Sequence, residues 1–429
     1  MAAERTTAEV LALGLYGLLM RVLTPFMLAK CWWRGRHEPA YRERWLERLG
    51  FGPRQEGGWI WLHAVSLGET RAAEPLIRAL RVANPGMKLL LTCSTATGWE
   101  AGQAMLEAGD AHAWLPFDTP GAVRRFLKRF RPRLGLLMET EVWPSLMHES
   151  SRTGLPMVLV NARLSAKSLR QGQRLGVLLK PAVRPLVALA QTREDADRLT
   201  AMGAARIEVM GNLKYDLALK DELLRRGQAW REQLSGRPVV LAAIFREGED
   251  EPLIECWRAL REPERPLLVL VPRHPQRFDE VAARVQKAGL SLSRRSAWRG
   301  EPTGQDVAAD VWLGDSLGEM QAYAALADVA LLGGSFARLG GHNLIEVAAC
   351  ACPLVMGPHT FNFAQAADSA QAHGAAWRVA DMAEGVAQAL EVLKDAARLQ
   401  AARDHASRWA SGQQGATQRT VKALQAWLS

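Results

Sequence analysis

Carboxylates stand at the ends of two apolar runs in the first half of the chain, where they could do acid–base chemistry. Glu69 follows the run 59–65 in HAVSLGET, and Glu139 ends the run 134–139 in METEVWP, with Glu141 close behind. A carboxylate at a helix start can cap backbone amides, whereas one that faces a ligand can accept a proton from a hydroxyl. Both roles are open for Glu69. A buried carboxylate at a strand end, such as Glu139, requires a cationic partner.

The second half carries polar clusters of another kind, suited to a phosphorylated ligand. Guanidinium groups and helix-start amides bind phosphate, and a carboxylate accepts hydrogen bonds from sugar hydroxyls. There is no Walker motif and no G-x-G-x-x-G, so the pattern favours a nucleotide monophosphate group bound without a P-loop. The clusters are Arg273 and His274 in VPRHPQRF; Asp315, Gly318 and Glu319 in LGDSLGEM; and Gly333, Gly334, Asn343 and Glu346 in GGSFARLGGHNLIE, which leads into a helix expected to begin near Asn343.

Other common kinds of site are not indicated. The five cysteines form no C-x-x-C pair, which argues against a disulfide framework and a zinc site. None of His274, His342 and His359 has a second ligand three or four residues further along a common helix, so we expect no metal. No cysteine has the sequence context of a catalytic thiol, which disfavours hydrolysis through a covalent thioester.

The elements that must position these residues alternate in a strand–helix rhythm after residue 58. This rhythm predicts an α/β protein of two Rossmann-like domains facing a cleft, over residues 34–212 and 213–429, with ligands at the carboxyl ends of the strands. A polar helix is expected near 220–234. Strands are expected near 59–65, 87–93, 112–116, 134–139, 157–161 and 186–191, and again near 238–243, 267–272, 309–313, 328–332, 353–356 and 376–379.

An apolar segment precedes the first domain. Residues 10–29 contain one charge, Arg21, and as a helix they would be about 30 Å long, enough to cross a bilayer. The basic stretch that follows predicts that the rest of the chain stays on the cytoplasmic side. Arg21 and Pro25 leave a second possibility open, a helix docked on the protein or lying in the membrane interface. Either way, residues 1–33 are expected to anchor the protein to a membrane.

The charge distribution indicates an anionic partner. The chain of 429 residues has 54 basic and 45 acidic residues, and its 48% hydrophobic content is that of a folded globular protein. Residues 150–193 include eight basic residues and no acidic one, and residues 124–133 add six more. Beside a membrane segment, such charge is expected to contact anionic head groups or a phosphorylated lipid substrate. Nucleic acid is disfavoured because no nucleic-acid-binding motif accompanies it.

Eight collinear segments resemble the 3-deoxy-D-manno-octulosonic acid (Kdo) transferases of lipopolysaccharide assembly. The resemblance extends from the apolar segment nearly to the C-terminus. The segments are HAVSLGE, LPFDTPGAVRRFLKRFRPRLGLLMETEVWP, NARLS, GNLKYD, VPRHPQRF, GDSLGEM, GGHNLIE and MGPHTFNF.

The resemblance implies a GT-B fold and an inverting, metal-independent glycosyltransferase without a cofactor. It implies CMP-Kdo as donor, the phosphorylated lipid A precursor (lipid IVA) as acceptor, and a place on the cytoplasmic side of the inner membrane, whose anionic surface the protein would contact. Glu69 would be the general base, and Glu139 and Lys214 would stabilise the transition state. The residues implied to contact CMP are Pro272, Arg273, Leu317, Gly318, Glu319, Asn343, Leu344, Ile345 and Glu346.

The chain departs from the family pattern at three places. Ile244-Phe245 stands where the family usually has Ser-Thr before the E-G-E run, so a hydroxyl contact would be lost. Asn343-Leu344-Ile345-Glu346 replaces N-P-L-E, which removes a proline that helps to fix a helix start. Ser145 replaces the usual Asn after E-x-W-P. These changes bear on donor affinity and acceptor binding more than on the reaction type.

Two other classes of function remain as alternatives. Sugar-nucleotide epimerases share the two-domain architecture and a nucleotide site, but they are usually soluble, which the apolar segment argues against. A scaffold that binds nucleotide and lipid without turnover is the other alternative, because Ile244 and Phe245 alter the expected donor site.

Overall fold

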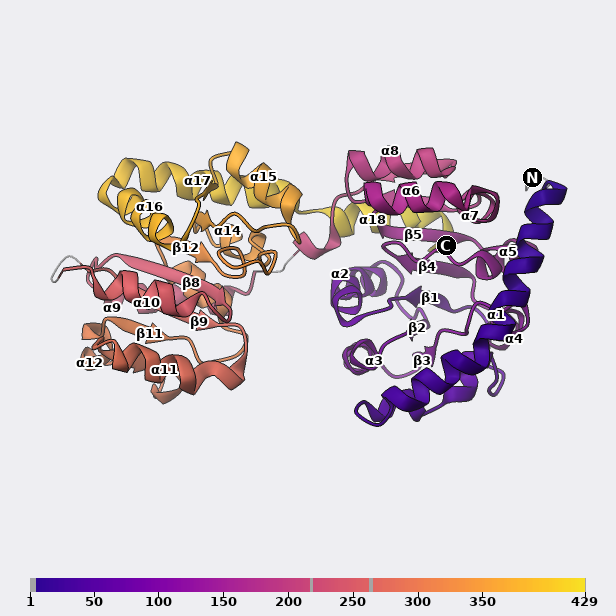
Figure 1. Ribbon diagram of the computed structural model, residues 1–429, viewed down its shortest axis with the longest axis horizontal. Helices are drawn as coiled ribbons and strands as arrows, with labels where there is room; N and C mark the ends of the chain where they lie inside the picture. The colour runs from indigo at the N-terminus through magenta and orange to yellow at the C-terminus, as the bar shows by residue number, and fades with distance from the viewer. Residues whose placement is uncertain (1–4, 217–218, 262–264, 429) are drawn as a thin grey trace. The chain divides into compact units, whose positions relative to one another are not determined.

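The computed structural model describes residues 5–216, 219–261 and 265–428, which form two compact units (Figure 1). The first unit runs to Asp216 and resumes at Gln414, and the second lies between them in the chain. Each is a parallel sheet with helices, as the strand–helix rhythm predicts. The expected boundary lay between residues 212 and 213, with 213–429 as the second domain. In the structure the chain leaves the first unit after Asp216, and the residues from Gln414 onward pack with that first unit.

The sheet of the first unit has seven parallel strands in the order β3-β2-β1-β4-β5-β6-β7. Its strands are β1 Ile60–His63, β2 Leu89–Cys93, β3 Ala111–Trp114, β4 Leu134–Met138, β5 Met157–Ala162, β6 Val187–Ala190 and β7 Arg206–Val209. Its helices are α1 Thr7–Arg34, η1 Pro39–Arg42, η2 Trp45–Leu49, α2 Leu67–Ala83, α3 Ala96–Gln103, α4 Pro120–Phe130, α5 Pro144–Thr153, α6 Ala166–Arg174, α7 Gly176–Val183, α8 Arg193–Met202, η3 Leu213–Tyr215 and α18 Ala416–Leu428.

The second unit repeats this plan, with seven parallel strands in the order β10-β11-β9-β8-β12-β13-β14. Its strands are β8 Val239–Phe245, β9 Leu267–Pro272, β10 Leu292–Arg294, β11 Val311–Leu313, β12 Val329–Leu332, β13 Leu354–Met356 and β14 Ala376–Arg378. Its helices are α9 Asp221–Gln233, α10 Asp250–Arg258, η4 Pro275–Arg277, α11 Phe278–Lys287, η5 Arg295–Ala297, α12 Gly304–Ala308, α13 Met320–Leu326, α14 Ile345–Ala349, α15 Ala364–Ala372, α16 Met382–Lys394 and α17 Ala396–Gln413.

The strands that the sequence predicts are mostly buried, and the two that it misses are exposed or short strands at the edge of a sheet. Helices cover both faces of a parallel sheet, so central strands read as unbroken apolar runs. In β1 all four residues are buried, whereas three of the four residues of β7 are exposed and β10 is only three residues long. Both β7 and β10 are edge strands, and the sequence analysis missed both, because a short or polar edge strand has no apolar run to mark it.

The strand orders define one topological switch point in each sheet. In the first sheet β1 is followed along the chain by β2 and β3 on one side, and β4 then pairs with β1 on the other. In the second sheet β8 stands in the same way between β9 and β12. Ligands of such sheets bind beside the carboxyl ends of the strands at the switch point. Glu69 and Glu139 follow β1 and β4, and Gly333 follows β12, so the expected site residues lie at these two positions.

The N-terminal helix α1 runs along the outside of the first unit (Figure 1). One side of α1 is packed, since Gly17 and Met20 are buried and Glu9 pairs with Arg184 at 3.2 Å. The opposite side is apolar and exposed; Leu11 and Leu15 are 69% and 70% exposed. By length and composition α1 is able to cross a membrane. The structure therefore shows a helix that is both docked along one side and apolar along the other.

Candidate active site and donor site

Glu69 lies in the first turn of α2, at the switch point of the first sheet. Ser66 caps the helix, accepting a hydrogen bond from the amide of Glu69 at 3.4 Å. The Glu69 carboxylate accepts one from the amide of Val65 at 2.9 Å and one from the Ser66 hydroxyl at 3.3 Å. The side chain thus helps to cap the helix, yet it is not fully buried. Both of the roles open in the sequence are compatible with this geometry.

A second carboxylate and a lysine lie close to Glu69. The ammonium group of Lys214, in η3, donates to the Glu139 carboxylate at 2.6 Å, which supplies the cationic partner that a strand-end carboxylate requires. Glu139 has a positive φ of 55°, which turns the chain sharply at the end of β4. Glu141 instead accepts a hydrogen bond from the Trp143 indole at 2.8 Å. The structure therefore brings together Glu69, Glu139 and Lys214, which are far apart in the sequence.

The clustered carboxylates change the acid–base properties of Glu69. Burial raises the pKa of Glu69 to about 7, and the charges of Glu139 and Glu141 act in the same direction, against the hydrogen bonds from Val65 and Ser66. Burial, and then the Glu139 charge, also raise the pKa of Glu141. A carboxyl group with a pKa near 7 is an effective proton acceptor at neutral pH.

Three amide side chains hold the loop that carries Lys214, and sequence reasoning assigned them no role. Asn161, with a positive φ of 52°, accepts a hydrogen bond from the Leu213 amide at 3.0 Å. Asn212 accepts one from the Lys214 amide and donates one to Gln191, both at 3.0 Å. The segments NARLS and GNLKYD that carry Asn161 and Asn212 were noted only for their family resemblance. Their physical role is to fix the backbone from which Lys214 reaches Glu139.

In the second unit, Pro272 and Arg273 lie at the carboxyl end of β9, beside β8. Pro272 pairs in register with Phe245, and the Arg273 amide donates to the Phe245 carbonyl at 2.8 Å. The Arg273 side chain is exposed, and it lies near His342. Burial, and then the charges of Arg273, Arg246 and His274, lower the pKa of His342 to about 4. His342 is therefore a neutral imidazole at neutral pH among cationic groups.

The segment from Asn343 to Glu346 differs from expectation at its helix. The helix α14 begins at Ile345, two residues after the expected start, and it is only five residues long. The Asn343 side chain accepts a hydrogen bond from the Ile345 amide at 3.1 Å, so it satisfies the helix start without a proline. Leu344 and Ile345 are fully buried, and the Ile345 amide is already used by the Asn343 side chain. The pKa of Glu346 is raised, mainly by burial.

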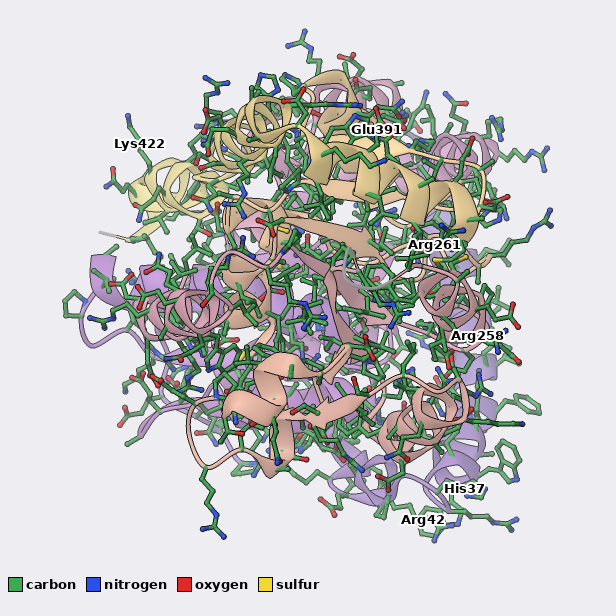
Figure 2. All side chains as sticks on the ribbon, turned by 90° about the vertical axis from the view of Figure 1, so that its left-hand side faces the viewer. His37, Arg42, Arg258, Arg261, Glu391 and Lys422 are labelled. Carbon is green, nitrogen blue, oxygen red and sulfur yellow. The ribbon has the colours of Figure 1, made fainter. Side chains whose placement is uncertain are left out.

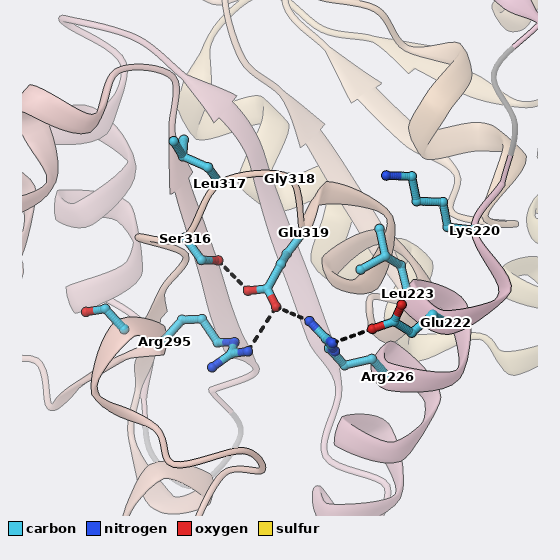
Figure 3. A pocket seen from close by; sticks show the side chains of 10 residues that line it. Lys220, Glu222, Leu223, Arg226, Arg295, Ser316, Leu317, Gly318 and Glu319 are labelled. Atoms are coloured by element: carbon cyan, nitrogen blue, oxygen red, sulfur yellow. Dashed lines mark hydrogen bonds and ion pairs between the residues drawn. The ribbon is translucent and has the colours of Figure 1, made fainter. Parts of the chain in front are cut away.

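Glu319 lies at the wall of a cavity of about 450 Å³ in the second unit (Figure 3). Its carboxylate is held by the Ser316 hydroxyl at 2.5 Å, by Arg226 at 2.5 Å and by Arg295 at 2.9 Å. Burial alone would raise the pKa of Glu319, but these hydrogen bonds lower it overall. Leu317 beside it is 77% exposed, and Gly318 has a φ of 80° that a side chain would strain.

The cavity brings in cations that the sequence analysis missed. Arg226 belongs to α9 and Arg295 to η5, and Lys220 just before α9 also lines the wall. No motif marks these residues, because they reach Glu319 from elements 93 and 24 residues away in the chain. Only the packing of these elements beside the β11–α13 loop reveals them.

Glu249 is a further residue whose role the sequence did not show. Its carboxylate is 1% exposed and accepts four backbone hydrogen bonds. The donors are the amides of Arg246 at 3.0 Å, Gly334 at 2.7 Å, Phe336 at 3.0 Å and Ala337 at 3.2 Å. Glu249 therefore fastens the loop after β12 to the loop after β8, at the switch point of the second sheet.

Metal-ligating side chains do not gather at either place. Across residues 5–216, 219–261 and 265–428, no three His, Cys, Asp or Glu side chains are grouped so that they could hold a metal ion.

Comparison with known proteins identifies the family. Residues 43–217 match the family model described as 3-deoxy-D-manno-octulosonic-acid transferase (kdotransferase). The chain is 49% identical to the 3-deoxy-D-manno-octulosonic acid transferase of Bordetella pertussis over 97% of this chain and 99% of that protein. It is 36% identical to the enzyme of the same name from Haemophilus influenzae, over 81% and 82% of the two chains.

Solved structures of other proteins share the fold. The HepE protein from Anabaena in complex with UDP superposes with a TM-score of 0.56 at 13% identity, covering 86% of this chain and 100% of that one. A glycosyltransferase from Rickettsia africae gives a TM-score of 0.55 at 11% identity, over 87% and 100% of the chains. At this identity the likeness concerns the fold alone, which is that of GT-B glycosyltransferases. By its sequence similarity, the chain belongs to the family of 3-deoxy-D-manno-octulosonic acid (Kdo) transferases.

Proposed function

We propose that this chain transfers Kdo from CMP-Kdo to a hydroxyl group of the phosphorylated lipid A precursor (lipid IVA) in lipopolysaccharide biosynthesis, in a single displacement that inverts the anomeric configuration. The observation that carries the proposal is Glu69, a partly exposed carboxyl group with a pKa of about 7 at the switch point of the first sheet. In a single displacement the acceptor oxygen attacks the anomeric carbon of Kdo, its proton passes to a base, and CMP leaves. No covalent intermediate with the protein is needed.

Glu69 is the proposed general base. Its pKa lies near neutral pH, so a useful fraction is ionised while its basicity remains high. The hydrogen bonds from Val65 and Ser66 hold the carboxylate in place at the start of α2. A fixed carboxylate that need not reorganise during proton transfer is what general base catalysis requires.

Glu139 and Lys214 are proposed to stabilise the transition state. Their 2.6 Å pair places a negative and a positive charge beside Glu69. The Glu139 charge raises the basicity of Glu69, while a nearby ammonium group stabilises negative charge that develops as CMP departs. Because the pair is held by the Asn161 and Asn212 loops, its charges are oriented before substrate binds.

The donor is proposed to bind the second unit. Pro272, Arg273, Leu317, Gly318 and Glu319 follow β9 and β11, at the carboxyl edge where such sheets bind ligands. The proposed contacts extend to Asn343, Leu344, Ile345 and Glu346. Cationic side chains stabilise the leaving phosphate, and we propose that the reaction requires no metal ion.

The first unit is proposed to bind the acceptor and the cytoplasmic face of the inner membrane. The exposed apolar side of α1 is suited to the lipid phase. The exposed face of α4 carries Arg124 and Lys128, and both line a cavity of about 510 Å³ together with Arg131 and Arg133. These cations are suited to the phosphates of head groups or of the acceptor.

The test is transfer by the detergent-solubilised full chain, with CMP-Kdo generated in situ and lipid IVA as acceptor, followed by mass spectrometry. A mass gain of one or more Kdo units is expected with the unaltered chain and with Glu100→Gln, an exposed glutamate of α3 in the same unit. Glu69→Gln should fold and lose the gain, since an amide cannot accept the proton. Full activity in Glu69→Gln would refute the role of Glu69, and no gain with any variant would refute the proposed reaction.

A further inference from the structure

Two arginines stand side by side at the switch point of the second sheet. Phe245 and Pro272 pair in register at the ends of β8 and β9, so Arg246 and Arg273 are the next residues of two adjacent parallel strands. The hydrogen bond of 2.8 Å from the Arg273 amide to the Phe245 carbonyl continues the ladder to this point. Neighbouring strands lie about 4.8 Å apart. The side chains of Arg246 and Arg273 therefore extend from neighbouring backbone positions at the ends of two adjacent strands.

His342 joins these arginines from the glycine-rich segment. The Gly341 amide donates to the Gly334 carbonyl at 2.7 Å, which folds this segment onto the loop after β12. A side chain on Gly334 would come within 3.2 Å of Nε2 of His342, so the imidazole lies directly against that loop. The charges of three other side chains lie near enough to His342 to lower the pKa of its imidazole; they are Arg246, Arg273 and His274.

The backbone amides at this switch point are already occupied. In many nucleotide-binding sheets such amides hold a phosphate. Here the Glu249 carboxylate accepts the amides of Gly334, Phe336 and Ala337. A ligand anion would be repelled by this buried carboxylate and would find these amides used. The negative charges of a ligand are therefore directed to the side chains of Arg246, Arg273 and His342.

Two of these side chains have nitrogen atoms with unused hydrogen-bonding capacity. Within the described residues, Nε of Arg246 and Nε2 of His342 are shielded from solvent and make no hydrogen bond. Nε of Arg246 does form an ion pair of 3.4 Å with Glu247, but this contact does not have hydrogen-bond geometry, and the Glu247 side chain is 53% exposed. Buried polar atoms without partners carry a free-energy cost that a bound ligand can remove. The geometry points to an anion that bridges Arg246 and His342.

We propose that Arg246 and His342 bind the carboxylate that Kdo carries on its anomeric carbon, and that Arg273 is thereby left for the phosphate of the donor. This inference rests on CMP-Kdo as the proposed donor. The carbon that is attacked bears both the carboxylate and the phosphate oxygen, so two anionic groups must be bound within a few ångströms of each other. Two adjacent arginines meet this requirement, and a nucleotide without the sugar acid would need only one of them.

The experiment compares CMP with CMP-Kdo by isothermal titration of the solubilised full chain, without acceptor. In Arg246→Met, we expect the CMP affinity to stay within about twofold and the CMP-Kdo affinity to fall about 10- to 100-fold, as for the loss of a charge-assisted hydrogen bond. Arg246→Lys, which keeps the charge, should lose less, and His342→Ala should also weaken CMP-Kdo selectively. The matched control is Arg258→Met, an exposed arginine at the end of α10 on the surface of the same unit (Figure 2).

The outcomes separate this inference from the proposed donor. An unchanged CMP-Kdo affinity in Arg246→Met overturns the assignment of Arg246. An equal loss for CMP and CMP-Kdo overturns it too, because Arg246 would then act on the phosphate or on folding. If the unaltered chain binds CMP but gains nothing from the Kdo group, no carboxylate subsite exists. If it binds neither compound, the donor itself is wrong.

Discussion

The pKa of Glu69 makes the pH dependence of Kdo transfer a direct test of the proposed base. Only ionised Glu69 accepts a proton, so kcat/KM should fall as the pH falls through a pKa of about 7. About half of the enzyme should be active at pH 7, about a tenth at pH 6 and about a hundredth at pH 5. An ordinary glutamate, with a pKa of about 4.3, would leave the rate flat from pH 6 to pH 8.

A second variant tests the cause of the shift. In Glu139→Gln, a negative charge near Glu69 disappears and Lys214 loses its partner, and both changes favour ionised Glu69. The acidic limb should therefore move to lower pH, by about 0.5 to 1 unit for partly screened charges, even though the maximal rate falls. The pH at which the acidic limb falls does not depend on the maximal rate, so the shift in the pKa of Glu69 and the loss of rate can be measured separately.

The assay is the initial rate of transfer at subsaturating donor and acceptor between pH 5 and pH 8.5, with Glu100→Gln as control. A limb that stays in place in Glu139→Gln would refute the electrostatic explanation. A profile that is flat down to pH 5.5 in the unaltered chain would refute Glu69 as the base whose pKa is raised. Buried Asp118, whose pKa burial raises to about 6, holds two amides at the start of α5 and could also titrate. Because the pKa of Asp118 is raised in the folded chain, its protonation as the pH falls through about 6 would increase the free energy of unfolding, and a denaturation curve at each pH measures this change.

Three further outcomes are expected. Glu249→Gln should lower the free energy of unfolding in urea by about 2 to 4 kcal/mol, because an amide cannot satisfy four backbone donors. The control Glu251→Gln, at an exposed position of α10, should change the free energy of unfolding by less than about 0.5 kcal/mol, and equal effects of the two variants would contradict the role of Glu249. Leu15→Glu should weaken binding to vesicles of anionic phospholipid by about tenfold or more in a co-sedimentation assay, whereas the control Val82→Glu, at a position on α2 that is 82% exposed, should not. Unchanged binding in Leu15→Glu would exclude this side of α1 from the membrane contact. EDTA should leave transfer unchanged, and a loss restored by Mg²⁺ would show that a metal takes part.

The sequence predicts the strands well where burial makes them apolar. Central strands such as β1 and β9 are buried at every position, and their runs stand out. The same analysis places Glu69 and Arg273 correctly at strand ends, since a polar residue after such a run marks the carboxyl edge of the sheet. The edge strands β7 and β10 carry no such signal. A short apolar run in the sequence indicates a buried strand, so a strand that is not buried cannot be predicted in this way.

The partners of the site residues were beyond the reach of the sequence. Lys214 entered only through family resemblance, because nothing in its surroundings shows that it meets Glu139, 75 residues earlier. Arg226 and Arg295 were missed for the same reason. Glu249 was seen as part of a motif, but its function depends on amides more than 80 residues away. Such contacts follow from the order of strands in the sheet, which a single sequence does not state.

The change at Ile244 and Phe245 affects the site differently from what the loss of hydroxyl groups suggested. Phe245 is buried against Phe336, and its carbonyl still holds the amide of Arg273. Ile244 has a φ of 60°, a strained conformation for a β-branched residue that costs of the order of 1 to 3 kcal/mol. Gly333 packs directly against this position, since a side chain on Gly333 would come within 2.2 Å of the Ile244 carbonyl. The pairing of β8 with β9 shifts register between Ala242 and Phe245, so a bulge in β8 contains Ile244 and comes just before Arg246.

The two switch points carry opposite charge, and this matches the two ends of the proposed reaction. At the first, Glu69, Glu139 and Glu141 outnumber Lys214, which suits the removal of a proton from an acceptor hydroxyl. At the second switch point, the charged groups near His342 are Arg246, Arg273 and His274. The carboxylate of Glu249 there is buried and accepts hydrogen bonds from backbone amides. A nucleotide leaving group develops negative charge as the bond breaks, and fixed cations stabilise that charge more than they stabilise the bound donor. We therefore propose that the same sheet topology, used twice with opposite polarity, lets the base and the donor site each be tuned by the residues of its own sheet.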